Sequence, residues 1–436
     1  MFALSSDNIP SIGNFIHPHS PLADDLQDFV RQDIDLETPP EAARGESLWE
    51  ELREQGSELW LDTGDVQAIE SLWNEDFSGL TTNNSLLNDQ VQRGVYDDLI
   101  RRTDRMLQEL PLSQRVREIA FVLNARHGLR LVQRFGCRVS VELHTDFAFD
   151  CAATIANARR LHGICPNHFV VKVPLTPAGL LATGMLRQEE IPVNMTLGFS
   201  ARQNYLATAL ANPSFVNIFL GRLNSYVSDN QLGDGYLVGE KATLASQREV
   251  SVFARALPES QTRQIAASLR DAEQVERVAG VDVITMPPSV AKQVRQQPPA
   301  SWNSRRNEEY TIDQTTYVSD ATLHLDTLWS ISAEVQKLVE TMILEPPKNA
   351  EELVQAARKQ GVTDLFPQLS REEVAELANE SKIPRHANWQ EKIAQGDLAI
   401  DSLLTLAGLA HFAGSQQALD ERIESSIAQD YGSAKK

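Results

Sequence analysis

A lysine inside an apolar run is the first residue that needs a chemical explanation. Lys172 lies within HFVVKVPL, whose composition favours a buried β-strand. Burying an ammonium group without a partner is costly, and burial disfavours the charged form of an amine. The neutral amine is the nucleophile that attacks a ketone to form an imine. Taken alone, Lys172 fits better as a lysine at a strand end whose stem reaches water.

Polar residues recur in the neighbouring apolar runs. Strand alternation places Asn194 and Thr196 on one face, and Glu142 lies within RVSVEL. Asp62 closes the run LWLD, and Asn83 follows GLTT. Each has a plain structural alternative as a turn cap, a loop residue or a packed strand residue. Together they indicate a polar interior that the strands position.

The elements that would hold these residues alternate between strand-like and helix-like runs. Between residues 58 and 296 the pattern is that of parallel βα units, which predicts a closed (β/α)8 TIM barrel. In such barrels the carboxyl ends of the strands form the active site. The predicted strands are residues 58–64, 78–83, 138–143, 168–175, 192–199, 215–221, 265–269 and 281–286.

The chain is predicted to have three parts. Residues 1–57 form an extended arm with one helix within 45–55, and residues 58–345 form the barrel with a closing helix. Residues 346–436 form a helical extension, in which AIDSLLTLAGLAHFAGSQQALDERI has an apolar face. This face suits intramolecular packing, or alternatively a partner or oligomer contact.

Composition excludes several classes of protein. The 436 residues are 42% hydrophobic and 23% charged, and no apolar run approaches the ~20 residues that span a bilayer. A net charge of −20 disfavours nucleic acid and anionic membranes as partners. Three cysteines, histidines without metal-ligand spacing and no GxGxxG predict a cytoplasmic protein with reduced thiols, no metal and no dinucleotide. His144 alone follows a strand closely enough to approach the site.

A run of motifs resembles the transaldolases in order and content. The resemblance covers some 240 residues, and it implies a (β/α)8 barrel with a Schiff-base lysine on the fourth strand. The element VNMTLGFS downstream of a strand lysine is its most specific part. The motifs are DTGD (62–65), TTNNSL (81–86), KVPLTPAGL (172–180), VNMTLGFS (193–200), FLGR (219–222) and ASLRD (267–271).

The resemblance implies four catalytic residues. Lys172 would form the imine with a ketose phosphate, and Asp62 would act as general base on the C4 hydroxyl. Glu142 and Thr196 would hold a water that relays protons. The lysine itself would replace any cofactor.

The resemblance also implies substrate-binding residues. Asn83 and Asn194 would hydrogen-bond the hydroxyls of the three-carbon enamine. Arg222, Arg270 and Ser268 would hold the phosphate, since guanidinium forks match its geometry. Surface salt bridges are the alternative for the two arginines.

The sequence departs from the transaldolase pattern at several positions. The stretch KVPLTPAG is closer to fructose 6-phosphate aldolases of the same superfamily. Glu142 and Phe219 argue for transfer, because those aldolases carry glutamine and a proton-donating tyrosine at these positions. Asn217 stands where a serine usually lies beside the phosphate, and Asn84 replaces a customary proline.

We therefore expect a transaldolase that interconverts sedoheptulose 7-phosphate plus glyceraldehyde 3-phosphate with erythrose 4-phosphate plus fructose 6-phosphate, in the pentose phosphate pathway. Its partners would be sugar phosphates and, because dimers are common in that family, a second copy of the chain. A Schiff-base aldolase of the fructose 6-phosphate aldolase type is one alternative. A barrel scaffold with a partner-binding helical tail is another.

Overall fold

The barrel predicted from the sequence is confirmed. The structure, a computed structural model, describes residues 15–38, 40–256, 260–312 and 323–433. Eight parallel strands pair in chain order, and the last pairs with the first, so the sheet is a closed barrel. The strands are β1 (Glu58–Asp62), β2 (Phe77–Thr81), β3 (Arg138–Glu142), β4 (Phe169–Pro174), β5 (Val193–Thr196), β6 (Phe215–Phe219), β7 (Arg263–Ala267) and β8 (Val283–Met286).

Helices surround the barrel, so both faces of each strand are covered, as parallel sheets require. Several helices begin at a residue whose side chain caps the first turn, such as Thr176 before Pro177 and Asp150 before Cys151. The helices between the strands are α3 (Val66–Glu70), α4 (Asn84–Gln92), α5 (Asp97–Met106), α6 (Leu112–Phe135), α7 (Cys151–Ile164), α8 (Pro177–Gln188), α9 (Ala201–Ala211), α10 (Leu220–Asp229), α11 (Val238–Ala256) and α12 (Ala272–Arg277), with α13 (Pro288–Gln296) after β8.

The amino-terminal segment is more structured than the sequence suggested. The helix expected within residues 45–55 is α2 (Ser47–Glu54), but the segment also contains α1 (Pro21–Arg31). Ser20 caps α1, and Leu26 and Val30 are fully buried. Arg31 of α1 donates to the carbonyl oxygens at the end of α7, which fixes α1 against the barrel wall. The apolar spacing of 22, 26, 29 and 30 was the available signal for this helix.

The carboxyl-terminal region is helical, as predicted, with different boundaries. The apolar spacing of residues 323–343 predicts one helix, but the structure has a short 3-10 helix at Leu325–Leu328 and α14 only from Ala333, where Ser332 caps it. A helix that was not predicted, α17, begins within residues 382–388 (KIPRHAN), a segment that the sequence predicts to be a break between helices. The helices are α14 (Ala333–Leu344), α15 (Ala350–Lys359), α16 (Arg371–Asn379), α17 (His386–Gln395) and α18 (Ile400–Ser433).

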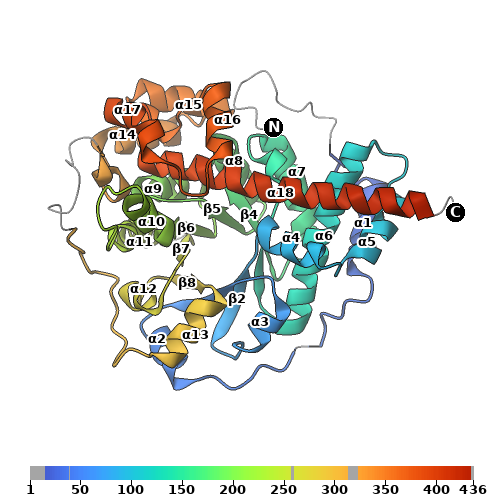
Figure 1. Ribbon diagram of the computed structural model, residues 1–436. Coiled ribbons are helices and arrows are strands. Elements are labelled where there is room, and N and C mark those ends of the chain that lie inside the picture. The colour runs from blue at the N-terminus through green and yellow to red at the C-terminus, as the bar shows by residue number, and fades with distance from the viewer. Residues whose placement is uncertain (1–14, 39, 257–259, 313–322, 434–436) are drawn as a thin grey trace.

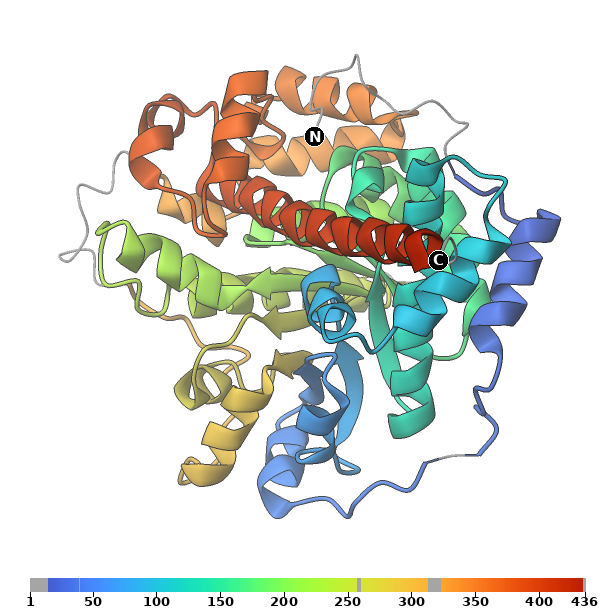
Figure 2. The ribbon, with the colours of Figure 1, turned by 45° about the vertical axis from the view of Figure 1, so that its right-hand side comes forward.

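Helix α18 crosses over the barrel. It starts beside the group α14–α17 on one side and ends beside α5 on the other (Figures 1 and 2). Its apolar residues Leu403, Leu404, Leu419 and Ile423 are fully buried and belong to the same core as the barrel strands. The apolar face seen in the sequence therefore packs within the chain. None of the helices in the described residues is long and apolar enough to cross a membrane.

Candidate active site

Lys172 lies inside the barrel on β4, and only 4% of it is exposed. The strand register places it between Glu142 on β3 and Asn194 on β5. Its Nζ donates to the carbonyl oxygen of Thr82 at 3.1 Å, and the ring of Phe412 lies 5.5 Å away. Among the described residues we find no carboxylate within salt-bridge distance of Nζ. The amine is therefore buried with weak partners.

Glu142 is buried beside this amine. Its Oε2 accepts a hydrogen bond from the backbone N–H of Asn84 at 2.8 Å, at the start of α4. Burial raises the pKa of Glu142 above its ordinary range, although Lys172 and the Asn84 amide both favour the carboxylate. A carboxyl group in this position can exchange a proton nearer to neutral pH than an ordinary glutamate can.

Thr196 closes β5 and is fully buried. Its hydroxyl oxygen has no hydrogen-bond partner among the residues that the structure describes. A buried hydroxyl normally finds a partner, so this group is available to a water or a substrate.

Asp62 lies at the carboxyl end of β1, and a hydroxyl fixes its carboxylate. The Thr81 hydroxyl donates to Asp62 Oδ1 at 2.7 Å and lies 2.9 Å from the Thr285 hydroxyl of β8. The two threonines were not predicted as site residues. Alternation within FSGLT and VITM was the only signal that they face the interior.

Three asparagines from β5, β6 and the residue before α4 also line the cavity. Asn83 caps α4, because its Oδ1 accepts from the Leu86 N–H at 3.0 Å, and among the described residues we find no acceptor for its amide N–H groups. Asn217 Nδ2 donates to Asn194 Oδ1 at 3.0 Å, and Asn194 Nδ2 donates to Ser140 at 3.0 Å. This chain of hydrogen bonds fixes the orientation of Asn194.

Two arginines form a cationic end of the site. Arg222 in the first turn of α10 is buried. Burial, together with the nearby Arg270, lowers the pKa of Arg222 to about 10, although Asp62 and Glu142 act to raise it. Its Nη1 has no hydrogen-bond partner in the described part of the chain. Ser268 and Arg270 follow β7, where Ser268 adopts a positive φ of 64°. A Cβ at Gly221 would lie 2.1 Å from the Ser268 carbonyl oxygen, so glycine permits this close approach.

A cavity of about 180 Å³ brings most of the predicted residues together. Glu142 and Thr196 do not line it, although Glu142 pairs with the lining residue Lys172 and Thr196 lies two residues after the lining residue Asn194 on β5. The predicted residues that line it are Asp62, Asn83, Lys172, Asn194, Asn217, Phe219, Arg222, Ser268 and Arg270.

Two lining residues come from the carboxyl-terminal extension, and the sequence did not reveal them. Lys382 lies between α16 and α17, and Phe412 lies on α18. The Phe412 ring also lies 5.6 Å from the Arg222 guanidinium, so it spans the distance between the lysine and the cationic end. No local pattern distinguishes either residue from an ordinary surface lysine or core phenylalanine.

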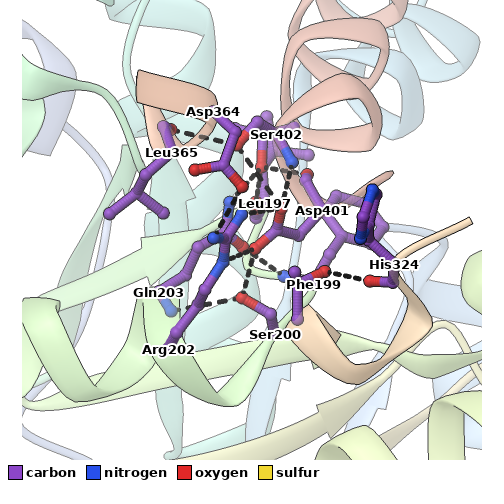
Figure 3. A network of polar contacts seen from close by, with 12 residues as sticks. Leu197, Phe199, Ser200, Arg202, Gln203, His324, Asp364, Leu365, Asp401 and Ser402 are labelled. Carbon is purple, nitrogen blue, oxygen red and sulfur yellow. Dashed lines mark hydrogen bonds and ion pairs between the residues drawn. The ribbon is translucent and has the colours of Figure 1, made fainter. Parts of the chain in front are cut away.

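A buried ion cluster holds the start of α18 against the barrel (Figure 3). Asp401 accepts from Arg202 Nε and Nη2, both at 2.8 Å, and from the Ser200 hydroxyl at 2.6 Å. Arg202 Nη1 also donates to Asp364 at 2.8 Å. Burial would lower the pKa of Arg202, but Asp401 and Asp364 more than offset this and raise it. The cluster lies directly after β5, the strand of Asn194 and Thr196.

His144 takes part in a second contact with α18. Its Nε2 lies 3.2 Å from Asp420 Oδ2, and its Nδ1 accepts from the Asp146 N–H at 3.2 Å. His144 does not line the cavity, so it contacts the covering helix rather than the site.

The fold and the cavity define a (β/α)8-barrel protein. Its cavity is lined by ionisable side chains at the carboxyl ends of the strands, where barrel enzymes hold their substrates. A family model described as "Transaldolase/Fructose-6-phosphate aldolase" matches residues 59–340. The chain belongs to this family, which confirms the resemblance seen in the sequence.

Curated relatives carry the name transaldolase. The "Transaldolase" of Synechocystis sp. is 30% identical over 262 residues, which cover 58% of this chain and 65%, just under two thirds, of that protein. The "Probable transaldolase" of Thermus thermophilus is 34% identical over 245 residues, covering 55% of this chain and 92% of that protein. The "Transaldolase" of Trichormus variabilis is 28% identical, with coverage of 62% and 86%.

Proposed function

We propose that the protein is a transaldolase that moves a dihydroxyacetone unit from a ketose phosphate, sedoheptulose 7-phosphate or fructose 6-phosphate, to an aldose phosphate through a Schiff base on Lys172. The observation that carries the proposal is the environment of this amine. Lys172 is 4% exposed inside the barrel, is hydrogen-bonded to one carbonyl oxygen, and opens onto a cavity whose far end is cationic. Relatives named transaldolase support the same reaction.

The first half of the reaction would join the donor to the enzyme. Lys172 Nζ attacks the C2 carbonyl to give a carbinolamine, and loss of water gives the imine. Both steps need proton transfers to and from oxygen. Glu142 and Thr196 would hold the water that carries these protons, which fits the raised pKa of Glu142 and the unpaired Thr196 hydroxyl.

The carbon–carbon bond would then break at C3–C4. Asp62 takes the proton of the C4 hydroxyl, the aldose leaves, and the bonding electrons move into the imine to form an enamine. The side-chain amide N–H groups of Asn83 and the fixed amide of Asn194 would hold the enamine hydroxyls. Attack of the enamine on an acceptor aldehyde, followed by hydrolysis, restores the free lysine.

Phe219 supports transfer over net aldol cleavage. It lines the cavity at the end of β6 and packs edge-to-face against Phe199. A phenyl ring cannot donate a proton to the enamine carbon, so the enamine would persist until an acceptor arrives. The fructose 6-phosphate aldolase alternative needs such a donor.

A transfer assay with and without acceptor tests the proposal. Fructose 6-phosphate with erythrose 4-phosphate should give glyceraldehyde 3-phosphate at rates at least tenfold above those without erythrose 4-phosphate, and Lys172→Ala should abolish both. Equal rates of glyceraldehyde 3-phosphate formation with and without acceptor would favour the fructose 6-phosphate aldolase alternative instead. A pentose phosphate pathway role, a cytoplasmic location, a homodimer, and independence from metals and cofactors remain predictions.

A further inference from the structure

The cationic end of the cavity contains a third basic residue. Lys382 lines the same cavity as Arg222, Ser268 and Arg270. It lies outside residues 59–340, the part of the chain that the family model matches. It is also separated from β7 and β8 by α13–α16, so its position depends on the packing of the extension.

Helix α10 holds the segment of Lys382 in place. The Asn230 side chain, directly after α10, donates to the Pro384 carbonyl oxygen at 3.0 Å and accepts from the His386 N–H at 2.8 Å. The Tyr226 hydroxyl lies 2.8 Å from His386 Nδ1, and Tyr226 is fully buried. Because Arg222 lies in the first turn of this same helix, one element positions the arginine and the segment that carries the lysine.

The positive charge of Lys382 is not neutralised within the described residues, where we find no hydrogen bond or ion pair for its ammonium group. The nearest acidic residue in sequence, Glu380, is engaged elsewhere, since its oxygens accept from Asn388 Nδ2 at 2.6 Å and Trp389 Nε1 at 3.2 Å. Burial lowers the pKa of Lys382, and Arg270 and Arg222 lower it further. Three cations that repel one another at one end of a cavity form a site for an anion.

We propose that Lys382 contacts the phosphate group of the ketose phosphate, and that this contact makes the enzyme select phosphorylated donors over neutral ones. The inference rests on the proposed function. Two guanidinium forks fix the orientation of the phosphate, and the lysine adds a compact charge on a flexible stem. In a chain with a net charge of −20, this local charge also offsets an unfavourable field for an anionic substrate.

The test compares Lys382→Met with Lys359→Met, a matched loss of one exposed lysine on α15 of the same extension. Losing one charged hydrogen bond should raise the KM for fructose 6-phosphate roughly tenfold and leave kcat within about twofold. The KM for unphosphorylated fructose should stay within about twofold, because that donor has no phosphate. Lys382→Arg should recover most of the affinity, and Lys359→Met should match the unmodified chain.

Inorganic phosphate tests the same contact without turnover. Calorimetric titration should show its Kd raised roughly tenfold by Lys382→Met and unchanged by Lys359→Met. Trapping of dihydroxyacetone on Lys172 by borohydride reports separately on the proposed function. An equal phosphate Kd in the two methionine variants, with equal melting temperatures, would overturn the role of Lys382, whether or not trapping succeeds.

Discussion

The carboxyl group of Glu142 differs from an ordinary surface glutamate in both its surroundings and its pKa. It is 6% exposed, faces Lys172 across the β3–β4 register and accepts one backbone hydrogen bond. Burial raises its pKa, so the carboxylate is lost at a higher pH than usual as the solution is acidified. A step that requires the carboxylate must slow over that same pH range.

The pH profile of transfer should therefore show this group. We expect kcat to fall as pH drops through the raised pKa of Glu142, and Glu142→Gln to lower kcat by about 10²- to 10⁴-fold and to remove that acid limb. The measurement is kcat against pH for both proteins, with Glu424→Gln on the exposed side of α18 as control. An acid limb that survives unchanged in Glu142→Gln would assign it to another group.

Residues within the strands could be predicted, whereas residues outside the barrel could not. Alternation along a strand is a local rule, and with the βα order and the motif resemblance it assigned Lys172, Glu142 and Asn194 to one interior, where the strand register then places them side by side. Lys382 and Phe412 reach the same cavity through contacts with residues more than a hundred positions away, as in the Asn230–Pro384 hydrogen bond. No spacing rule encodes such contacts.

Among the elements, α18 is the one whose position matters most to the site. The Arg202–Asp401 cluster joins its first turn to the segment after β5, and the Thr405 hydroxyl donates to the Leu197 carbonyl oxygen at 2.9 Å. Phe412 then lies two turns further along the helix, over Lys172 and Arg222. A shift of this helix would move the ring that covers the amine.

Removing the anchor should weaken both the fold and the site. Asp401→Ala leaves Arg202 buried with Asp364 as its one counter-ion among the described residues, and breaking a buried pair in this way costs about 3–5 kcal/mol. We expect a lower urea midpoint and faster proteolysis of the carboxyl-terminal region, with Glu424→Ala as control. Unfolding and proteolysis like those of the control would mean that the cluster does not hold α18.

The helices of the extension were harder to predict than the strands. Apolar residues recur at helical spacing throughout residues 323–343, but helix α14 starts only at Ala333, after the Ser332 cap. Helix α17 begins two residues after Pro384, in a segment whose proline predicts an interruption between helices. Caps and breaks shift boundaries by a few residues, and tertiary packing decides which of several short helices forms.

At the scale of the whole molecule, the barrel and the extension are joined by shared hydrophobic clusters, one containing α18 and another containing α14 and α15. Leu403, Leu404, Leu419 and Ile423 of α18 are buried together with the strand residues, and Lys382 and Phe412 complete the cavity. Both parts of the chain also contribute to the charge of the site. Although the net charge of the chain is −20, Arg222 and Arg270 of the barrel and Lys382 of the extension lie at one end of that cavity. The extension is thus a wall of the site as well as part of the fold.

Reductive trapping of the intermediate tests the central claim most directly. Borohydride added with fructose 6-phosphate should leave a reduced three-carbon adduct, found by mass spectrometry on the peptide that contains Lys172, and Lys172→Ala should show none. An unmodified Lys172 under conditions of turnover, or an adduct on a different lysine, would contradict the account.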